Sequence, residues 1–143
     1  MRLKFVAIGL LLSLLMAFDG QRGAGLKPSD AEAIHTVVQQ QLNALLIDDE
    51  TRAFDMASVQ ARAFFGSASN FLEIIKTHYG PIYRHRIAQF SEAHTVGNIT
   101  LQPVRVTAND SRVWLAIYRM ERDAGGAWKI DGCQLLPTAN IAL

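Results

Sequence analysis

The dipeptide Gly80-Pro81 divides the chain into two parts with different hydrophobic patterns. Proline lacks a backbone N–H and disfavours the α conformation of the residue before it, so a helix has to end here. Before this point, apolar residues recur at helical spacing; after it come segments rich in Val, Ile, Tyr, Trp and Thr, which predict strands. Helices followed by strands that are joined by short turns indicate an α+β domain.

The longest predicted helix begins at Ser29 and ends near Ile47. Ser29 and Glu32 have the spacing of a capping box, in which two side chains satisfy backbone N–H groups at the start of a helix. The apolar positions that follow at helical spacing are Ile34, Val37, Val38, Leu42 and Leu45. We therefore expect an amphipathic helix with this stripe turned toward the core.

Shorter helices are predicted between residues 48 and 80. The acidic triplet at residues 48–50 suits the positive end of a helix dipole, so we interpret it as a helix start and not as a metal site. Residues 59–65 form a further helical segment, and Gly66 is its C-terminal stop. The last helix starts at Ser67 or Ser69 and ends at Gly80-Pro81.

Four strands are predicted, over residues 83–96, 99–107, 112–121 and 127–136. Short connections make consecutive strands antiparallel neighbours, so we expect a four-stranded antiparallel meander with the N-terminal helices covering one face. Residues 112–121 are apolar on both faces, which places that strand centrally. Because proline cannot donate to a ladder, Pro103 predicts that its strand is an edge or carries a bulge.

The N-terminus has the pattern of a secretory signal peptide. A basic start at residues 1–4 precedes an apolar run at residues 5–18, which as a helix would span only about 21 Å at about 1.5 Å per residue. The hydrocarbon core of a bilayer is about 30 Å thick, so a cleaved signal is favoured over a permanent membrane span. We predict residues 1–25 as signal peptide and linker, 26–143 as a single domain, and export to the periplasm or out of the cell.

Charge and cysteine content exclude several classes of function. The whole chain has a formal net charge of +1, and the signal region carries three of its basic residues, so the domain is close to neutral. Binding to nucleic acid needs a basic face, so we predict no nucleic-acid partner. Cys133 is the single cysteine, which leaves no internal disulfide, and we interpret it as a small buried strand residue.

Residues 77–86, THYGPIYRHR, gather histidine, tyrosine and arginine at the predicted corner between helix and sheet. Alternation along a strand starting at Tyr83 would place Tyr83 and His85 on one face and Arg84 on the other. Arg84 would then pair with an acidic side chain of the sheet, and the candidates are Glu92, Glu121 and Asp131. We favour a structural role for this stretch over a pocket rim or a catalytic site.

Several stretches together carry a resemblance to a known family. They are the opening helix with Asp48-Asp49, Phe64-Phe65-Gly66, Phe71-Leu72, Tyr79-x-Pro81-x-Tyr83-Arg84, the segment from Trp114 to Glu121, and Trp128-Lys129-Ile130-Asp131-Gly132-Cys133-x-Leu135. This set resembles a bacterial family of domains of unknown function, numbered 4864, over roughly residues 30–137. The layout is also similar to the nuclear-transport-factor-2-like superfold, which implies a cone with a pocket. Residues 58–66 depart from the hairpin usual there, which implies a shallower cone.

No catalytic signature is present in the sequence. It lacks the motifs of an activated nucleophile, a phosphate loop or a zinc helix, and its four histidines lack metal-ligand spacing, so we predict no metal and no cofactor. We therefore expect a non-enzymatic module that binds a small molecule or a protein. The candidate pocket-rim residues are Tyr79, Tyr83, His85, Trp114 and Tyr118. The alternatives are an isomerase- or hydratase-like enzyme, with an acid/base residue at the cone mouth and a tyrosine donor, and a scaffold that forms a homodimer through its sheet.

Overall fold

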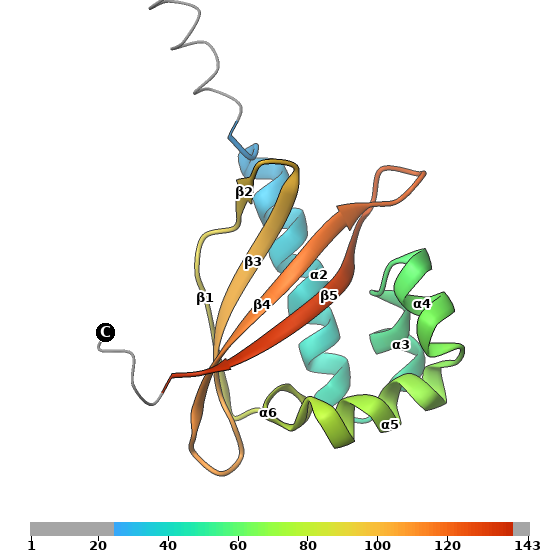
Figure 1. Ribbon diagram of the computed structural model, residues 1–143, viewed down its shortest axis with the longest axis vertical. Coiled ribbons are helices and arrows are strands. Elements are labelled where there is room, and N and C mark those ends of the chain that lie inside the picture. Colours follow the sequence, from blue (N-terminus) through green and yellow to red (C-terminus); the bar gives the residue numbers. More distant parts are fainter. Residues whose placement is uncertain (1–24, 139–143) are drawn as a thin grey trace, which may run out of the picture.

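Helices occupy the first part of the folded chain and strands the second, so the predicted α+β class is confirmed (Figure 1). The computed structural model describes residues 25–138, and the predicted signal peptide lies outside them. The helices are α2 (Pro28–Leu46), α3 (Glu50–Asp55), α4 (Val59–Phe65), α5 (Ala68–His78) and α6 (Gly80–Tyr83). The strands are β1 (Ile87–Phe90), β2 (His94–Val96), β3 (Ile99–Thr107), β4 (Val113–Arg122) and β5 (Trp128–Pro137).

The strands form one antiparallel sheet in the order β1-β3-β4-β5, and β2 pairs with the other end of β3. β1 and β2 lie end to end along β3, so the four predicted strand segments are neighbours in chain order, as the meander requires. The expected single strand at residues 83–96 is wrong in detail, because it starts only at Ile87 and is interrupted between β1 and β2. The buried side chain of Gln102 lies at this interruption. Its amide nitrogen donates hydrogen bonds to the carbonyls of Ser91 at 2.7 Å and Pro103 at 2.9 Å.

The edge-strand alternative for Pro103 is wrong, because β3 lies between β1 and β4. The pairing of β3 with β4 is regular at Pro103, and the irregularity lies on the other side, where residues 91–93 leave the ladder. The Pro103 carbonyl accepts a hydrogen bond from the Ser91 backbone at 3.1 Å. The proline nitrogen therefore faces the same neighbour, at the place where the chain between β1 and β2 leaves the ladder. Because no ladder bond is required there, the missing N–H is tolerated in an interior strand.

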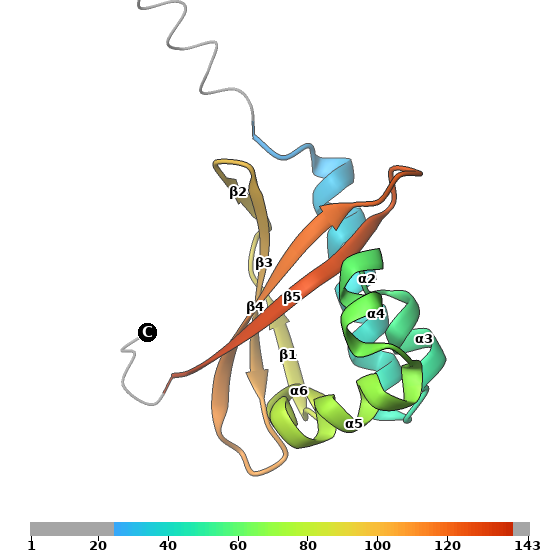
Figure 2. The ribbon, with the colours of Figure 1, turned by 45° about the vertical axis from the view of Figure 1, so that its right-hand side comes forward.

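The core lies between α2 and the inner face of the sheet. The side chains of Ile34, Val38, Leu42 and Leu45 are fully buried, as the helical stripe predicted. Across from them, the sheet contributes Val104, Val106, Ala116, Tyr118 and Met120, all buried. Figure 2 shows the helices on one side of the sheet and the other side uncovered.

Helix starts follow local chemistry, with one correction. Helix α2 begins at Pro28, and Lys27 is its N-cap without a side-chain hydrogen bond, so the predicted capping box at Ser29 is wrong. Proline fixes the backbone angle that the first helical position needs, which starts the helix one residue earlier. Asp49 and Ser67 cap α3 and α5 as expected, and Gly66 ends α4 with φ of 82°.

The chain makes one more helical turn, α6, which begins at Gly80 itself. Helix α5 ends at His78 as predicted, but Pro81 lies within the first turn of α6. Proline is tolerated at that position because its missing N–H has no partner in the first turn anyway. Tyr83 is consequently helical, and the assignment of Tyr83 and Arg84 to opposite faces of a strand is wrong.

Candidate functional site

A pocket of about 360 Å³ opens between strand β5 and helices α4 and α5. Most of its lining is apolar: Ala57, Ala61, Phe64, Phe65, Phe71, Ile75, Tyr79, Ile82 and Ile130. Gln41, Gln60, Asp131, Gly132 and Cys133 complete it. Figures 1 and 2 show α4 beside the β5 edge of the sheet, with α5 leading from it toward α6.

Three phenylalanines form a row along the helical wall of the pocket. The rings of Phe64 and Phe65 meet edge to face at 5.2 Å between centroids, and those of Phe65 and Phe71 at 5.0 Å. Phe71 is buried, whereas the side chain of Phe64 is 81% exposed. No residue of α4 is fully buried, so this helix is held mainly by its ends and by the aromatic row.

The opposite wall is set by a β-bulge in β5. Arg119 pairs with Gly132 and Met120 with Ile130, so Asp131 is the extra residue. The segment before α4 runs along this edge: Ser58 N–H donates to the Ile130 carbonyl at 2.8 Å, and Ile130 N–H donates to the Met56 carbonyl at 2.9 Å. These bonds hold Asp131 beside Ser58.

Ser58 joins the two walls through its hydroxyl group. The hydroxyl donates to the Asp131 carboxylate at 2.7 Å and accepts a hydrogen bond from Ala61 N–H at 3.1 Å. The second contact makes Ser58 the N-cap of α4. The other Asp131 oxygen lies 3.7 Å from Nε of Arg119. One buried hydroxyl thus fixes both the start of α4 and the carboxylate in the pocket wall.

Cys133 and Tyr118 lie side by side on β5 and β4, at the strand wall of the pocket. The two residues are paired across β4 and β5, and Cys133 contributes to the lining while the side chain of Tyr118 is fully buried behind it. Burial raises the pKa of the Cys133 thiol to about 12 and the pKa of Tyr118 well above its ordinary value. Within residues 25–138, the Tyr118 hydroxyl makes no hydrogen bond, and the group beside it is the thiol of Cys133, which is a weak donor and acceptor.

The five residues predicted for a pocket rim do not share one pocket. Tyr79 lines the pocket described above, and Tyr118 lies in the core behind its wall. Trp114 is half-buried and lines two other surface hollows, one of which includes Gly80 and Pro81. Tyr83 and His85 are placed elsewhere by the turn of α6.

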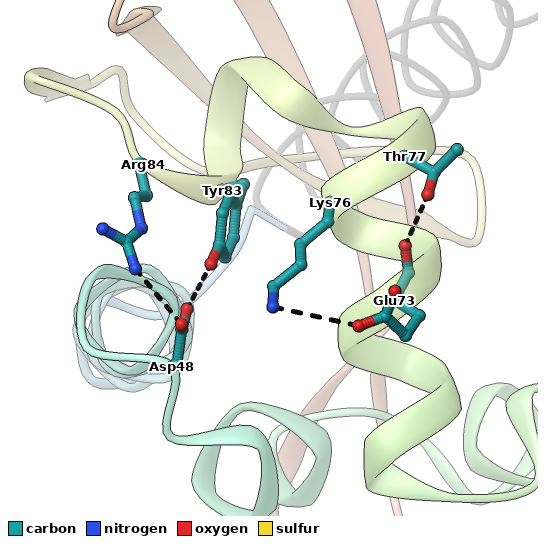
Figure 3. Close-up of polar contacts among 6 residues, drawn as sticks. All are labelled: Asp48, Glu73, Lys76, Thr77, Tyr83 and Arg84. Atoms are coloured by element: carbon teal, nitrogen blue, oxygen red, sulfur yellow. Dashed lines mark hydrogen bonds and ion pairs between the residues drawn. The ribbon is translucent and has the colours of Figure 1, made fainter.

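Tyr83 and Arg84 converge on Asp48, at the corner between α2 and α3 (Figure 3). The Tyr83 hydroxyl donates to one carboxylate oxygen, and Nη2 of Arg84 lies 3.1 Å from the other. The hydrogen bond from Tyr83, and then the contact with Arg84, lower the pKa of Asp48. The predicted partners of Arg84, namely Glu92, Glu121 and Asp131, are therefore wrong, because α6 turns the side chain back toward α2.

His85 is a structural residue of the α6–β1 corner. Its side chain is 9% exposed, and Nδ1 lies 3.3 Å from the Ile82 carbonyl. Burial lowers the pKa of His85, and the hydrogen bond to the backbone offsets part of this effect. The ring does not line the pocket.

Sequence reasoning placed no site residue on α4 or in the β5 bulge. Phe64, Phe65, Phe71, Ser58 and Asp131 were absent from the predicted rim. One signal was present: two adjacent phenylalanines on a helix point about 100° apart, so a short helix cannot bury both. The bulge at Asp131 left no comparable signal in the sequence.

The described part of the chain contains no group of three or more His, Cys, Asp or Glu residues that could hold a metal ion. Nor does any helix within residues 25–138 have the length and apolar character needed to cross a membrane.

Fold and site together define a small α+β domain with an apolar pocket between an edge strand and two helices. The chain belongs to the family called domain of unknown function (DUF4864), whose model matches residues 27–142. This match confirms the family resemblance seen in the sequence. Searches of curated proteins and of solved structures each returned no match.

Proposed function

We propose that this domain is a non-enzymatic binding module that takes a small, largely apolar molecule into the pocket between β5 and helices α4 and α5. The observation that carries the proposal is the pocket of about 360 Å³, whose lining is mostly aromatic and aliphatic. Sites for small molecules typically have volumes of roughly 300–1,000 Å³ and combine apolar walls with a few polar groups. Gln41, Asp131 and Cys133 supply those groups here.

The architecture suits a ligand-binding role of the kind found in the nuclear-transport-factor-2-like superfold, and we propose that this domain is a shallow variant of it. Support comes from the helices that cover one face of an antiparallel sheet and from the pocket at their junction. Helix α4 occupies residues 59–65, within the segment where that superfold usually has a hairpin. Because one fold hosts many activities, the fold alone does not select the function.

An isomerase- or hydratase-like enzyme is the alternative, and one observation favours it. Asp131 and Tyr79 line the same pocket, which is the pairing of a carboxylate with a tyrosine donor that such chemistry needs. The Asp131 carboxylate is, however, already bonded to Ser58 and lies near Arg119, and both contacts stabilise its negative charge. In an enzyme, Asp131→Asn would abolish turnover at nearly unchanged ligand affinity, whereas a binding module would show no turnover in either form.

Export is part of the proposed function. The basic start and the apolar run at residues 5–18 support a cleaved signal and a role in the periplasm or outside the cell. N-terminal sequencing of the protein from the cell envelope tests this, and a mature chain that begins at Met1 would contradict cleavage. A homodimer formed through the uncovered face of the sheet remains a proposal, which sedimentation at several protein concentrations tests.

Filling the pocket tests the binding function directly. Ala61 lines the pocket from α4, whereas Ala63 on the same helix is exposed and lies outside the lining. We expect the wild-type protein to take up the fluorescent apolar probe N-phenyl-1-naphthylamine and Ala61→Phe to bind it at least about tenfold more weakly. Ala63→Phe is the matched control and should bind like the wild type. Equal uptake by Ala61→Phe would contradict the pocket as the binding site. Native mass spectrometry of protein purified from its own envelope would then identify the bound molecule.

A further inference from the structure

We infer that the molecule bound in this pocket is a small organic cation, an amine carried on an apolar or aromatic body. This inference rests on the proposed binding function and adds the chemical class of the ligand. It follows from the sign of the charge that lines the pocket, from the contacts of that charge and from the rings around it.

Among residues 25–138, Asp131 is the single charged residue in the pocket lining, which includes no lysine, arginine or histidine of this part of the chain. Its side chain is 20% exposed and lies beside apolar groups such as Ile130 and Ala57. An ionised group in such surroundings interacts more strongly with a nearby charge than it would in water. A cationic ligand gains from this charge, and an anionic ligand is repelled by it.

The existing partners of Asp131 leave its charge only partly compensated. Ser58 donates a hydrogen bond from a neutral hydroxyl. Arg119 approaches at 3.7 Å, and its side chain is 60% exposed. An exposed ion pair of this kind is typically worth no more than about 1 kcal/mol. The carboxylate therefore retains negative charge that would attract a second cation at the β5 wall of the pocket.

The aromatic lining favours the same class of ligand. Phe64, Phe65, Phe71 and Tyr79 all contribute to the pocket. The face of an aromatic ring carries negative electrostatic potential and attracts ammonium groups within about 6 Å. An apolar body would lie along the phenylalanine row and its amine would point toward β5, where Asp131 lies. A neutral apolar molecule would gain no attraction from the Asp131 carboxylate. It would also remove water from that charged group without replacing the lost interactions, which opposes binding.

Three matched probes test the inference on the wild-type protein: 3-phenylpropylamine, 3-phenylpropan-1-ol and 3-phenylpropionate. They share one apolar body and differ in charge. In titration calorimetry, we expect the amine to bind about tenfold more tightly than the alcohol, and the carboxylate most weakly. In Asp131→Asn, the affinity for the amine should fall to about the affinity for the alcohol. Asp55→Asn changes the net charge equally at an α3 position outside the lining and should keep the preference.

The outcomes separate this inference from the proposed function. If the alcohol binds as tightly as the amine and Ala61→Phe weakens both, the pocket binds ligands but the inference of a cation is overturned. An amine preference that persists in Asp131→Asn would also overturn it, because the charge would act from elsewhere. If no probe binds to the wild-type protein, both the inference and the proposed function fail. The comparison of amine and alcohol needs no variant, so poor folding of Asp131→Asn leaves the test intact.

Discussion

The Tyr83 hydroxyl donates a hydrogen bond to the Asp48 carboxylate across 35 positions of sequence. Asp48 lies at the end of α2 with a φ of 55°, a left-handed conformation that aspartate tolerates better than most residues. The contact ties the α2–α3 corner to α6, and α6 carries Ile82 into the pocket lining. The contacts among Asp48, Tyr83 and Arg84 therefore help to hold α6, and with it Ile82, in place at the pocket.

Truncation of Tyr83 is expected to destabilise the fold. The ring is half-buried against the core, and the charged ends of Lys76 and Arg84 lie 5.5 and 5.3 Å from its centroid. Tyr83→Ala should cost about 2–3 kcal/mol, less than the roughly 3–5 kcal/mol of a fully buried ring. Tyr83→Phe keeps the packing and should be much milder, as should Arg84→Ala. Urea unfolding of the three variants checks this, and equal stability of Tyr83→Ala and wild type would contradict it.

Acid should weaken the contact between Asp48 and Tyr83. The folded-state pKa of Asp48 is lowered from 3.8, first by the hydrogen bond from Tyr83 and also by Arg84. A depressed folded pKa contributes stability above the unfolded value, and this contribution is lost as pH falls through the folded pKa. Stability of the wild type should therefore fall more steeply below 3.8 than that of Asp48→Asn, which cannot titrate. If thermal unfolding shows the same pH dependence for the wild type and Asp48→Asn, the prediction that acid weakens this contact is wrong.

The sequence predicted the class of fold because that class depends on local pattern. Periodicity and the break at Gly80-Pro81 separated helices from strands, and short turns required a meander. The edge-strand prediction from Pro103 failed because a missing N–H disrupts a sheet only where the neighbouring strand offers a carbonyl to it. Between β1 and β2 the neighbouring chain leaves the ladder, so no such hydrogen bond is lost. Such a gap is a property of the neighbouring chain and leaves no mark at the proline.

The pocket could not be predicted in the same way. It depends on the bulge at Asp131 and on how far α4 stands from β5, and both are set by tertiary contacts through Ser58 and Ile130. Aromatic and histidine content drew attention to residues 77–86, of which only Tyr79 and Ile82 reach the pocket. A local concentration of aromatic, histidine and arginine residues thus did not predict where the pocket lies.

Cys133 should react slowly in the native protein. Burial raises its thiol pKa to about 12, so almost none of it is thiolate near neutral pH, and the thiolate is the reactive form. Modification by a thiol reagent at about pH 8 should be at least about a hundredfold slower in the native than in the unfolded state. Following the reaction with and without denaturant provides the measurement. Similar rates in the two states would show that the pocket exposes the thiol.

Removal of the Tyr118 hydroxyl should not destabilise the protein. The group is fully buried and lacks a hydrogen-bond partner among the described residues, and such a group typically costs about 1–3 kcal/mol. Tyr118→Phe keeps the ring and removes the unsatisfied atom, so the melting temperature should rise or stay unchanged. Tyr118→Leu is the packing control and should lower it. A clear loss of stability in Tyr118→Phe would mean that the hydroxyl is bonded in solution.

Ser58→Ala should damage both the fold and the pocket, because one hydroxyl serves both. It caps α4 and also satisfies the Asp131 carboxylate, in a side chain that is 1% exposed. Loss of a serine cap typically costs about 1 kcal/mol, and the carboxylate left without its donor adds about 1–3 kcal/mol. Ser67→Ala is the matched control, because Ser67 caps α5 at an exposed position and its hydroxyl has no second partner among the described residues. We expect the Ser58 variant to be destabilised at least about twice as much as the Ser67 variant, and hydrogen exchange of α4 amides to accelerate only in the former. Equal effects of the two substitutions would show that Ser58 acts as an ordinary helix cap and does not hold the pocket wall.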